Sequence, residues 1–145
     1  MDSFLEVIRK YADFNGRARR KEYWMFALFV FVIYIGLAIA GGLLTAIIAK
    51  TSHGMGGLVF LAPAYLFILA MLIPSLAVAV RRLHDTGKSG WFLLIGLIPF
   101  IGSIILLVFY CMDSQPGPNE YGPNPKGIGA PVNPYPSFPQ APPAY

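Results

Sequence analysis

Charged residues are scarce in this chain of 145 residues, and their scarcity excludes most soluble folds. Asp, Glu, Lys and Arg together make up 12% of the sequence, whereas about 25% is typical of soluble proteins. Hydrophobic residues make up 56%, and so short a chain cannot bury that much apolar surface inside a water-soluble domain. We therefore expect a small integral membrane protein whose apolar surface is covered by lipid.

Cysteine and strand-like alternation are also nearly absent. The chain has one cysteine, Cys111, which excludes an internal disulfide framework and a multi-cysteine metal site. No segment of about ten residues alternates between polar and apolar side chains, so an outer-membrane barrel is not expected. Eleven Lys and Arg against seven Asp and Glu are too small an excess for a nucleic-acid-binding surface. We expect no metal and no cofactor.

Three long stretches without any charge are each long enough to cross a bilayer. They cover 27 residues from Tyr23 to Ala49, 30 from Thr51 to Val80 and 24 from Ser89 to Met112, and a helical span needs about 20. Because backbone groups in lipid must bond with one another, we predict helices. The expected fold class is an all-α membrane protein. Its transmembrane domain, residues 23–112, is a three-transmembrane-helix bundle with spans at about 24–48, 57–80 and 91–112.

Two of these stretches leave an alternative open. Pro99 and Gly102 interrupt the third stretch, which is either one kinked span, the reading we favour, or a re-entrant hairpin that returns to its starting side. Ala38-Ile39-Ala40 in the first stretch fits a signal-peptide cleavage site. We favour an uncleaved span there, because the apolar run is longer than the roughly 7–15 residues of a signal-peptide core.

The two flanking segments differ from the spans and from each other. Residues 1–22 form a basic segment, and residues 3–14 have the spacing of an amphipathic helix that lies on the headgroups or packs on the bundle. Residues 113–145 hold ten of the thirteen prolines, which predicts a disordered Pro-rich tail. The last four residues, 142–145, match a PPxY docking pattern, with a plain solvated linker as the default reading.

Basic residues predict the orientation and a candidate site. Residues 1–23 carry six Lys and Arg and the loop after the second stretch carries three, so we expect a cytoplasmic N-terminus. The densest polar group is residues 81–90. Within it Asp85 can form an ion pair with either Arg81 or Arg82. This group can also form, with the basic N-terminal segment, a net-positive site for anionic headgroups or a partner. The candidate residues of this site are Arg17, Arg20, Glu22, Arg81, Arg82, His84 and Asp85.

Three groups of residues together resemble the motifs of one known family. They are residues 14–17 with Arg20, Glu22, Tyr23 and Trp24; residues 81–85 with 89–91; and Pro99, Gly102, Gly117, Asn119, Tyr121, Gly122 and Pro125. The chain resembles the bacterial "domain of unknown function 805" family, small inner-membrane proteins of the YhaH/YhaI type. The resemblance covers roughly residues 1–126. It implies a multi-pass protein of the bacterial inner (plasma) membrane and supplies no established activity.

We expect a non-enzymatic accessory or scaffold protein that binds anionic lipid headgroups or a membrane-protein partner through its cytoplasmic arginines. The alternative is a small-solute pore or transport accessory, built as a homo-oligomer through the small residues Gly36, Ala38, Ala40 and Gly42. A membrane enzyme that uses His84 and Asp85 is the third reading. It is disfavoured because adjacent residues on a helix point about 100° apart.

Overall fold

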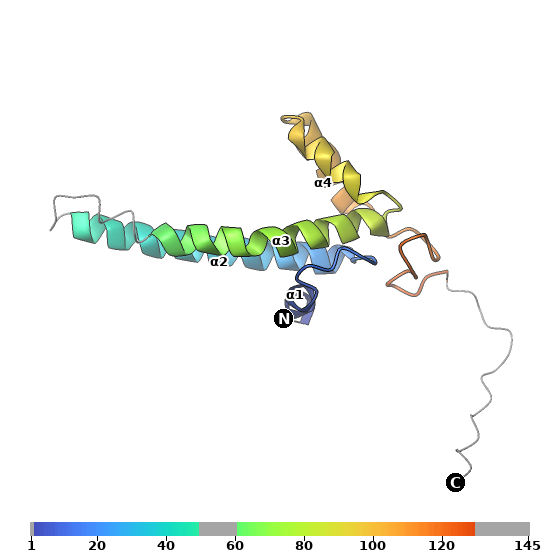
Figure 1. Cartoon of the computed structure of the whole chain (residues 1–145), viewed down its shortest axis with the longest axis horizontal. Coiled ribbons are helices and arrows are strands. Elements are labelled where there is room, and N and C mark those ends of the chain that lie inside the picture. The colour runs from blue at the N-terminus through green and yellow to red at the C-terminus, as the bar shows by residue number, and fades with distance from the viewer. Residues whose placement is uncertain (1, 50–60, 130–145) are drawn as a thin grey trace, which may run out of the picture.

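The computed structural model describes residues 2–49 and 61–129, and every regular element within them is a helix (Figure 1). The elements are α1 (Asp2–Arg9), α2 (Arg20–Ala49), α3 (Ala62–Asp85), the 3₁₀ helix η2 (Gly90–Leu97) and α4 (Ile101–Cys111). The expected helical fold is therefore confirmed for this part of the chain. The proline motif at residues 142–145 lies outside the described residues.

The long helices α2 and α3 lie side by side in opposite directions and form the body of the molecule (Figure 1). Their 30 and 24 residues correspond to about 45 and 36 Å, more than the roughly 30 Å of a bilayer core. Large apolar side chains such as Phe31 and Leu66 are 60% and 65% exposed along them. Both helices are thus long and apolar enough to cross a membrane.

The third apolar stretch does not form one helix. A 3₁₀ helix, η2, runs to Leu97, the chain reverses at Pro99 and Phe100, and α4 returns alongside η2. Gly102 makes this reversal possible, because any Cβ there would overlap the carbonyl group of Ile95. At about 2.0 and 1.5 Å per residue, each arm is only about 16 Å long.

Both ends of this hairpin lie at the same end of α3. Gly90, where the hairpin begins, is next to Val80 and His84, and Met112, where it ends, accepts a hydrogen bond from Arg82. The three-span count is therefore not confirmed. Here the structure has a hairpin, the shape of the alternative that the sequence left open, and the hairpin is tilted away from the α2–α3 pair (Figure 1).

Helix α1 is shorter than expected and packs on the helix pair. It ends at Arg9, and fully buried Val7 contacts a core formed with Phe26 of α2 and Val78 of α3. The Tyr11 hydroxyl donates a hydrogen bond to the Ala70 carbonyl of α3. The structure thus has the packing on the bundle that the sequence allowed, whereas the interfacial position expected for this helix stays a prediction.

The C-terminal wrap, residues 113–129, is folded against the end of the helix pair (Figure 1). Ser114 and Asn124 are each 8% exposed in it, and the Gln115 N–H donates to the Asp85 carbonyl at 2.9 Å. The expectation of a disordered tail from residue 113 is therefore wrong for residues 113–129. Proline content alone predicts disorder, but Ser, Gln and Asn side chains beside the prolines form hydrogen bonds with the end of α3 and with one another.

Candidate functional site

The start of α2, the end of α3 and both ends of the hairpin meet at one end of the molecule, which we call the arginine end. Five charged residues there are at most 8% exposed. We call them the arginine cluster: Arg17, Glu22, Arg81, Arg82 and Asp85. A buried charge is stable only when it is paired and hydrogen-bonded, so the partners of these groups determine what the site can do.

Arg17 joins three separate segments of the chain. Gly16, which has a φ of +81°, turns the chain so that Arg17 points under the wrap rather than along α2. Its Nε donates to Asp85 at 3.0 Å, and its Nη1 and Nη2 donate to the carbonyl groups of Gly117 at 2.8 Å and Gln115 at 2.6 Å. A single guanidinium thus holds the wrap against the end of α3.

Arg82 holds the returning arm of the hairpin in the same way. Its guanidinium is fully buried and pairs with Asp85, three residues further along α3. Its Nε donates to the Tyr110 carbonyl at 3.2 Å, and its Nη2 donates to the Met112 carbonyl. Tyr110 is in the last turn of α4 and Met112 is its C-cap, a place where unsatisfied acceptors and the negative end of the helix dipole attract a cation.

Asp85 is the common acceptor of the cluster. It is completely buried and accepts hydrogen bonds from Arg17, from Arg82 and from the Ser114 hydroxyl, the last at 2.6 Å. Of the two ion pairs that the sequence allowed for Asp85, the structure forms the one with Arg82. Arg81 turns to a different partner.

Arg81 and Glu22 form a second buried pair between α3 and α2. The Nη1 of Arg81 donates to Glu22 at 3.0 Å. The Nε and Nη2 of Arg81 are buried and have no hydrogen-bond acceptor among the described residues. Three arginines against two carboxylates leave one formal positive charge in the cluster, and the carbonyls at the end of α4 are the groups that partly compensate it.

His84 lies beside the cluster and has separate contacts. Its ring stacks on that of Tyr121 in the wrap, with centroids 3.7 Å apart and planes 1° apart. Its Nδ1 is 3.2 Å from the Gly16 carbonyl. Because a carbonyl can only accept, this contact assigns the proton of the imidazole to Nδ1. Asn119 then donates to the His84 carbonyl at 2.9 Å, which closes the wrap over the end of α3.

Arg20 differs from the other candidate residues because it lies at the surface. Its side chain is 44% exposed, pairs with Asp113 at 3.2 Å and donates to the Cys111 carbonyl at 3.2 Å. Lys126 also pairs with Asp113. The hydrogen bond from Lys126 and one from the Ser114 N–H lower the pKa of the Asp113 carboxyl.

The structure brings the sequence-predicted residues to one end of the molecule but gives most of them internal partners. Arg17, Arg82 and Asp85 form one buried network, Arg81 and Glu22 form a second, His84 stacks on the wrap and Arg20 lies outside. Charge patterning missed the other partners, which are the Ser114 hydroxyl, a donor to Asp85, and accepting backbone carbonyls from residue 110 onward. Within residues 2–49 and 61–129, no group of three His, Cys, Asp or Glu could hold a metal ion.

The chain is similar in sequence to known bacterial inner membrane proteins. The chain is 42% identical over 130 residues to inner membrane protein YhaH of Escherichia coli K12, which covers 87% of this chain and 98% of that protein. It is 43% identical over 126 residues to inner membrane protein YhaI of the same strain, with 87% and 97% covered. No solved structure matches.

A third relative is the uncharacterized protein YiiR of E. coli K12, which is 29% identical over 135 residues, with 76% of this chain and 84% of that protein covered. The model of one family matches residues 11–123, a range that begins after α1 and includes α2, α3, the hairpin and most of the wrap. The chain therefore belongs to the family described as protein of unknown function (DUF805), whose members include inner membrane proteins.

Proposed function

We propose that this protein is a non-enzymatic accessory protein of the bacterial inner membrane that binds anionic lipid headgroups at its arginine end. The observation that carries the proposal is the division of its basic residues into two sets. Arg17, Arg81 and Arg82 are buried in the cluster, whereas Arg19 and Lys21 are exposed where α2 begins. Exposed bases next to the end of a span attract anionic lipids by about 1 kcal/mol each.

In this proposal the buried arginines stabilise the fold, and the exposed bases bind lipid headgroups. Arg17 and Arg82 use their donors on Asp85 and on backbone carbonyls of the wrap and of α4. They hold the hairpin and the wrap in place, which keeps the exposed bases together on one surface. A membrane-protein partner with acidic residues could use the same surface, and the experiment below distinguishes it from lipid.

The orientation follows from the same residues. Because each arm of the hairpin is about 16 Å long, it reaches about halfway through a core of about 30 Å. The hairpin then inserts into one leaflet, and the wrap lies on the same side as residues 2–19. The positive-inside rule places that side in the cytoplasm.

The test is native mass spectrometry of the full chain with phosphatidylglycerol and phosphatidylcholine of identical acyl chains. The double variant Arg19→Gln with Lys21→Gln should retain phosphatidylglycerol about 30-fold less well, from about 1 kcal/mol per base. Lys50→Gln, which removes a single basic residue between the two long apolar stretches, is the matched comparison and should lower retention at most about fivefold, from about 1 kcal/mol. Equal retention by both variants contradicts headgroup binding at this surface.

The same spectra test two alternatives, a protein partner and a homo-oligomeric pore. If a foreign subunit is bound and its retention depends on Arg19 and Lys21, the ligand of this surface is a protein and not a lipid. A homo-oligomer without retained lipid would favour the pore.

A further inference from the structure

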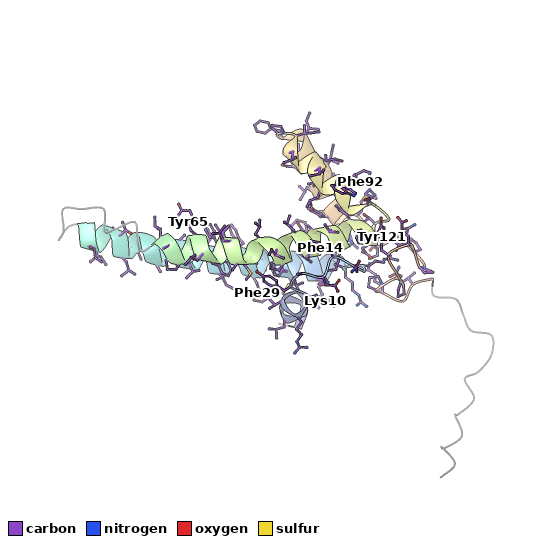
Figure 2. All side chains as sticks on the ribbon, in the orientation of Figure 1. Lys10, Phe14, Phe29, Tyr65, Phe92 and Tyr121 are labelled. Atoms are coloured by element: carbon purple, nitrogen blue, oxygen red, sulfur yellow. The ribbon has the colours of Figure 1, made fainter. Side chains whose placement is uncertain are left out.

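A pocket of about 500 Å³ opens at the base of the hairpin, where four segments of the chain meet. Phe14 comes from the turn before α2, His84 from the end of α3, Trp91 from η2 and Tyr121 from the wrap. Figure 2 shows Phe14 and Tyr121 at the arginine end of the molecule, with Phe92 of η2 nearby. The volume is within the range of small-molecule sites, about 300–1,000 Å³.

The pocket holds a hydrogen-bond acceptor, the Nε2 of His84, to which no described residue donates. His84 is 9% exposed, and its Nδ1 donates to Gly16, so its Nε2 keeps a free lone pair. The Nε2 lies beside Gly90, 3.5 Å from where a Cβ of residue 90 would be, and no described residue donates to it. A ligand in this pocket that carries a hydrogen-bond donor can therefore bond to this Nε2.

Aromatic rings form the walls around this acceptor. Phe14, Trp91 and Tyr121 line the pocket, and the Tyr121 ring is held parallel to the imidazole. The carboxylate of Glu120 lies next in sequence to Tyr121, and burial together with that carboxylate raises the pKa of the Tyr121 hydroxyl. Aromatic faces and a nearby carboxylate attract cations, and ammonium groups in particular.

The position of the pocket matches the headgroup layer of a membrane. Polar residues Thr86 to Ser89 precede it in the chain, and the uncharged hairpin follows it. Trp91 is 79% exposed at this boundary, which is where tryptophan side chains concentrate in membrane proteins. Leu93 and Leu94 continue the lining from the polar end into the apolar hairpin.

We propose that this pocket binds the primary ammonium headgroup of a phosphatidylethanolamine-type lipid. The ammonium donates an N–H to the Nε2 of His84 while the rings of Phe14, Trp91 and Tyr121 surround it. The glycerol and acyl chains follow Leu93 and Leu94 along the hairpin. A choline headgroup would also fit among the rings, but it has no N–H to donate. This site is separate from the exposed bases Arg19 and Lys21 and goes beyond the proposed function.

The experiment is a competition between lipids on the full-length protein, measured by native mass spectrometry. The delipidated protein receives phosphatidylethanolamine, phosphatidylcholine and phosphatidylglycerol with identical acyl chains at equal concentrations. The proposal expects phosphatidylethanolamine to be retained about tenfold more than phosphatidylcholine, the effect of one hydrogen bond that involves a charged group.

Two substitutions of His84 separate the acceptor from the packing. In His84→Asn the side-chain amide nitrogen takes the place of Nδ1 and can still donate to Gly16, while the acceptor at Nε2 is lost. In His84→Gln the amide oxygen can take the place of Nε2. We expect the preference for phosphatidylethanolamine to disappear in the Asn variant and to persist in the Gln variant.

A variant at the exposed ring keeps the proposal testable if both His84 variants misfold. Trp91→Ala removes a side chain that is 79% exposed, so the fold should tolerate it, and retention of phosphatidylethanolamine should fall. Leu97→Ala is the matched control, since Leu97 is 78% exposed on the hairpin and outside the pocket.

Three results would overturn the inference. They are an unchanged lipid preference in a folded His84→Asn protein, equal retention of the ethanolamine and choline lipids by the wild-type chain, and equal losses in Trp91→Ala and Leu97→Ala. The variants at Arg19 and Lys21 should leave the ethanolamine preference intact. Failure of the anionic-lipid proposal and failure of this one are therefore distinguishable.

Discussion

Replacing Asp85 by alanine should detach the hairpin and the wrap from α3. The Asp85 carboxylate is completely buried and is the acceptor shared by Arg17, Arg82 and Ser114. Its removal leaves two guanidinium groups facing each other, without the charge that holds them together. The two remaining sets of acceptors, on the wrap and on α4, are backbone carbonyls only.

The magnitude follows from the burial of the pair. Breaking a buried ion pair by removing one partner destabilises a protein by about 3–5 kcal/mol. At about 1.4 kcal/mol for each factor of ten, the population of the detached form would rise by a factor of about 10² to 10⁴ relative to the wild-type chain. The free energy lost, about 3–5 kcal/mol, is a large share of the stability of a typical domain, which is about 5–15 kcal/mol.

The single cysteine gives a direct assay. Cys111 is exposed and lies in the last turn of α4, beside the carbonyls that Arg82 and Arg20 contact. A spin label on Cys111 in the full chain, reconstituted in vesicles, should become more mobile in Asp85→Ala. Asp113→Ala is the matched comparison: it removes an acid from the same end of the molecule, but one whose side chain is 61% exposed, so it should raise label mobility less than Asp85→Ala.

A label that is equally immobile in both variants would refute the reasoning, because the hairpin would then be held by other contacts. The double variant Arg17→Ala with Asp85→Ala provides a second check. Once the carboxylate is absent, removing Arg17 also removes an unpaired buried charge. The two changes should therefore cost less together than the sum of the single costs, by about 0.5–3 kcal/mol.

Two further predictions concern the hairpin turn and the wrap. Gly102→Ala forces a Cβ into the Ile95 carbonyl and should destabilise the hairpin by about 1–3 kcal/mol. Gly36→Ala is the control and should not destabilise the protein in this way, because nothing lies near its Cβ position. Thermal unfolding in detergent compares the two variants. Because the pKa of Asp113 is lowered from 3.8, mainly by its hydrogen bond with Lys126, its contribution to stability should be present above that value and lost as the pH falls through the lowered pKa. Label mobility at Cys111 should thus stay constant from neutral pH to about pH 4, rise below it, and lose that acid step in Asp113→Asn.

Helix existence could be predicted from the sequence more reliably than topology. The first uncharged stretch gave a span at about 24–48, and α2 covers Arg20–Ala49. The third stretch is also uncharged and has a sufficient length, so composition favoured a span there. The hairpin depends on Gly102, which permits contact with the Ile95 carbonyl, and on Phe100, which adopts a φ of +61°. Both are tertiary features that hydropathy does not contain.

The members of the site could be predicted, but their roles could not. Charge clustering selected all five residues of the arginine cluster, because charges next to apolar spans are conspicuous. Their partners are mostly backbone carbonyls of the wrap and of α4, such as those of Gln115 and Tyr110. Any residue can supply a carbonyl, so no sequence pattern marks it. The resemblance to the family was the one signal that included residues of the wrap, among them Asn119 and Tyr121.

The hairpin also changes how the basic residues bear on orientation. With a third span, Lys126 would be on the opposite side from the N-terminal segment. With the hairpin and the wrap at the arginine end, Lys126 pairs with Asp113 beside Arg20. Ten of the eleven Lys and Arg then belong to one side, and Lys50 alone belongs to the other. The positive-inside rule is a statement about such asymmetry, so the hairpin strengthens the prediction that the arginine end is cytoplasmic. An accessibility test of Cys111 in inside-out and right-side-out vesicles decides it, and reaction from the periplasmic face would contradict it.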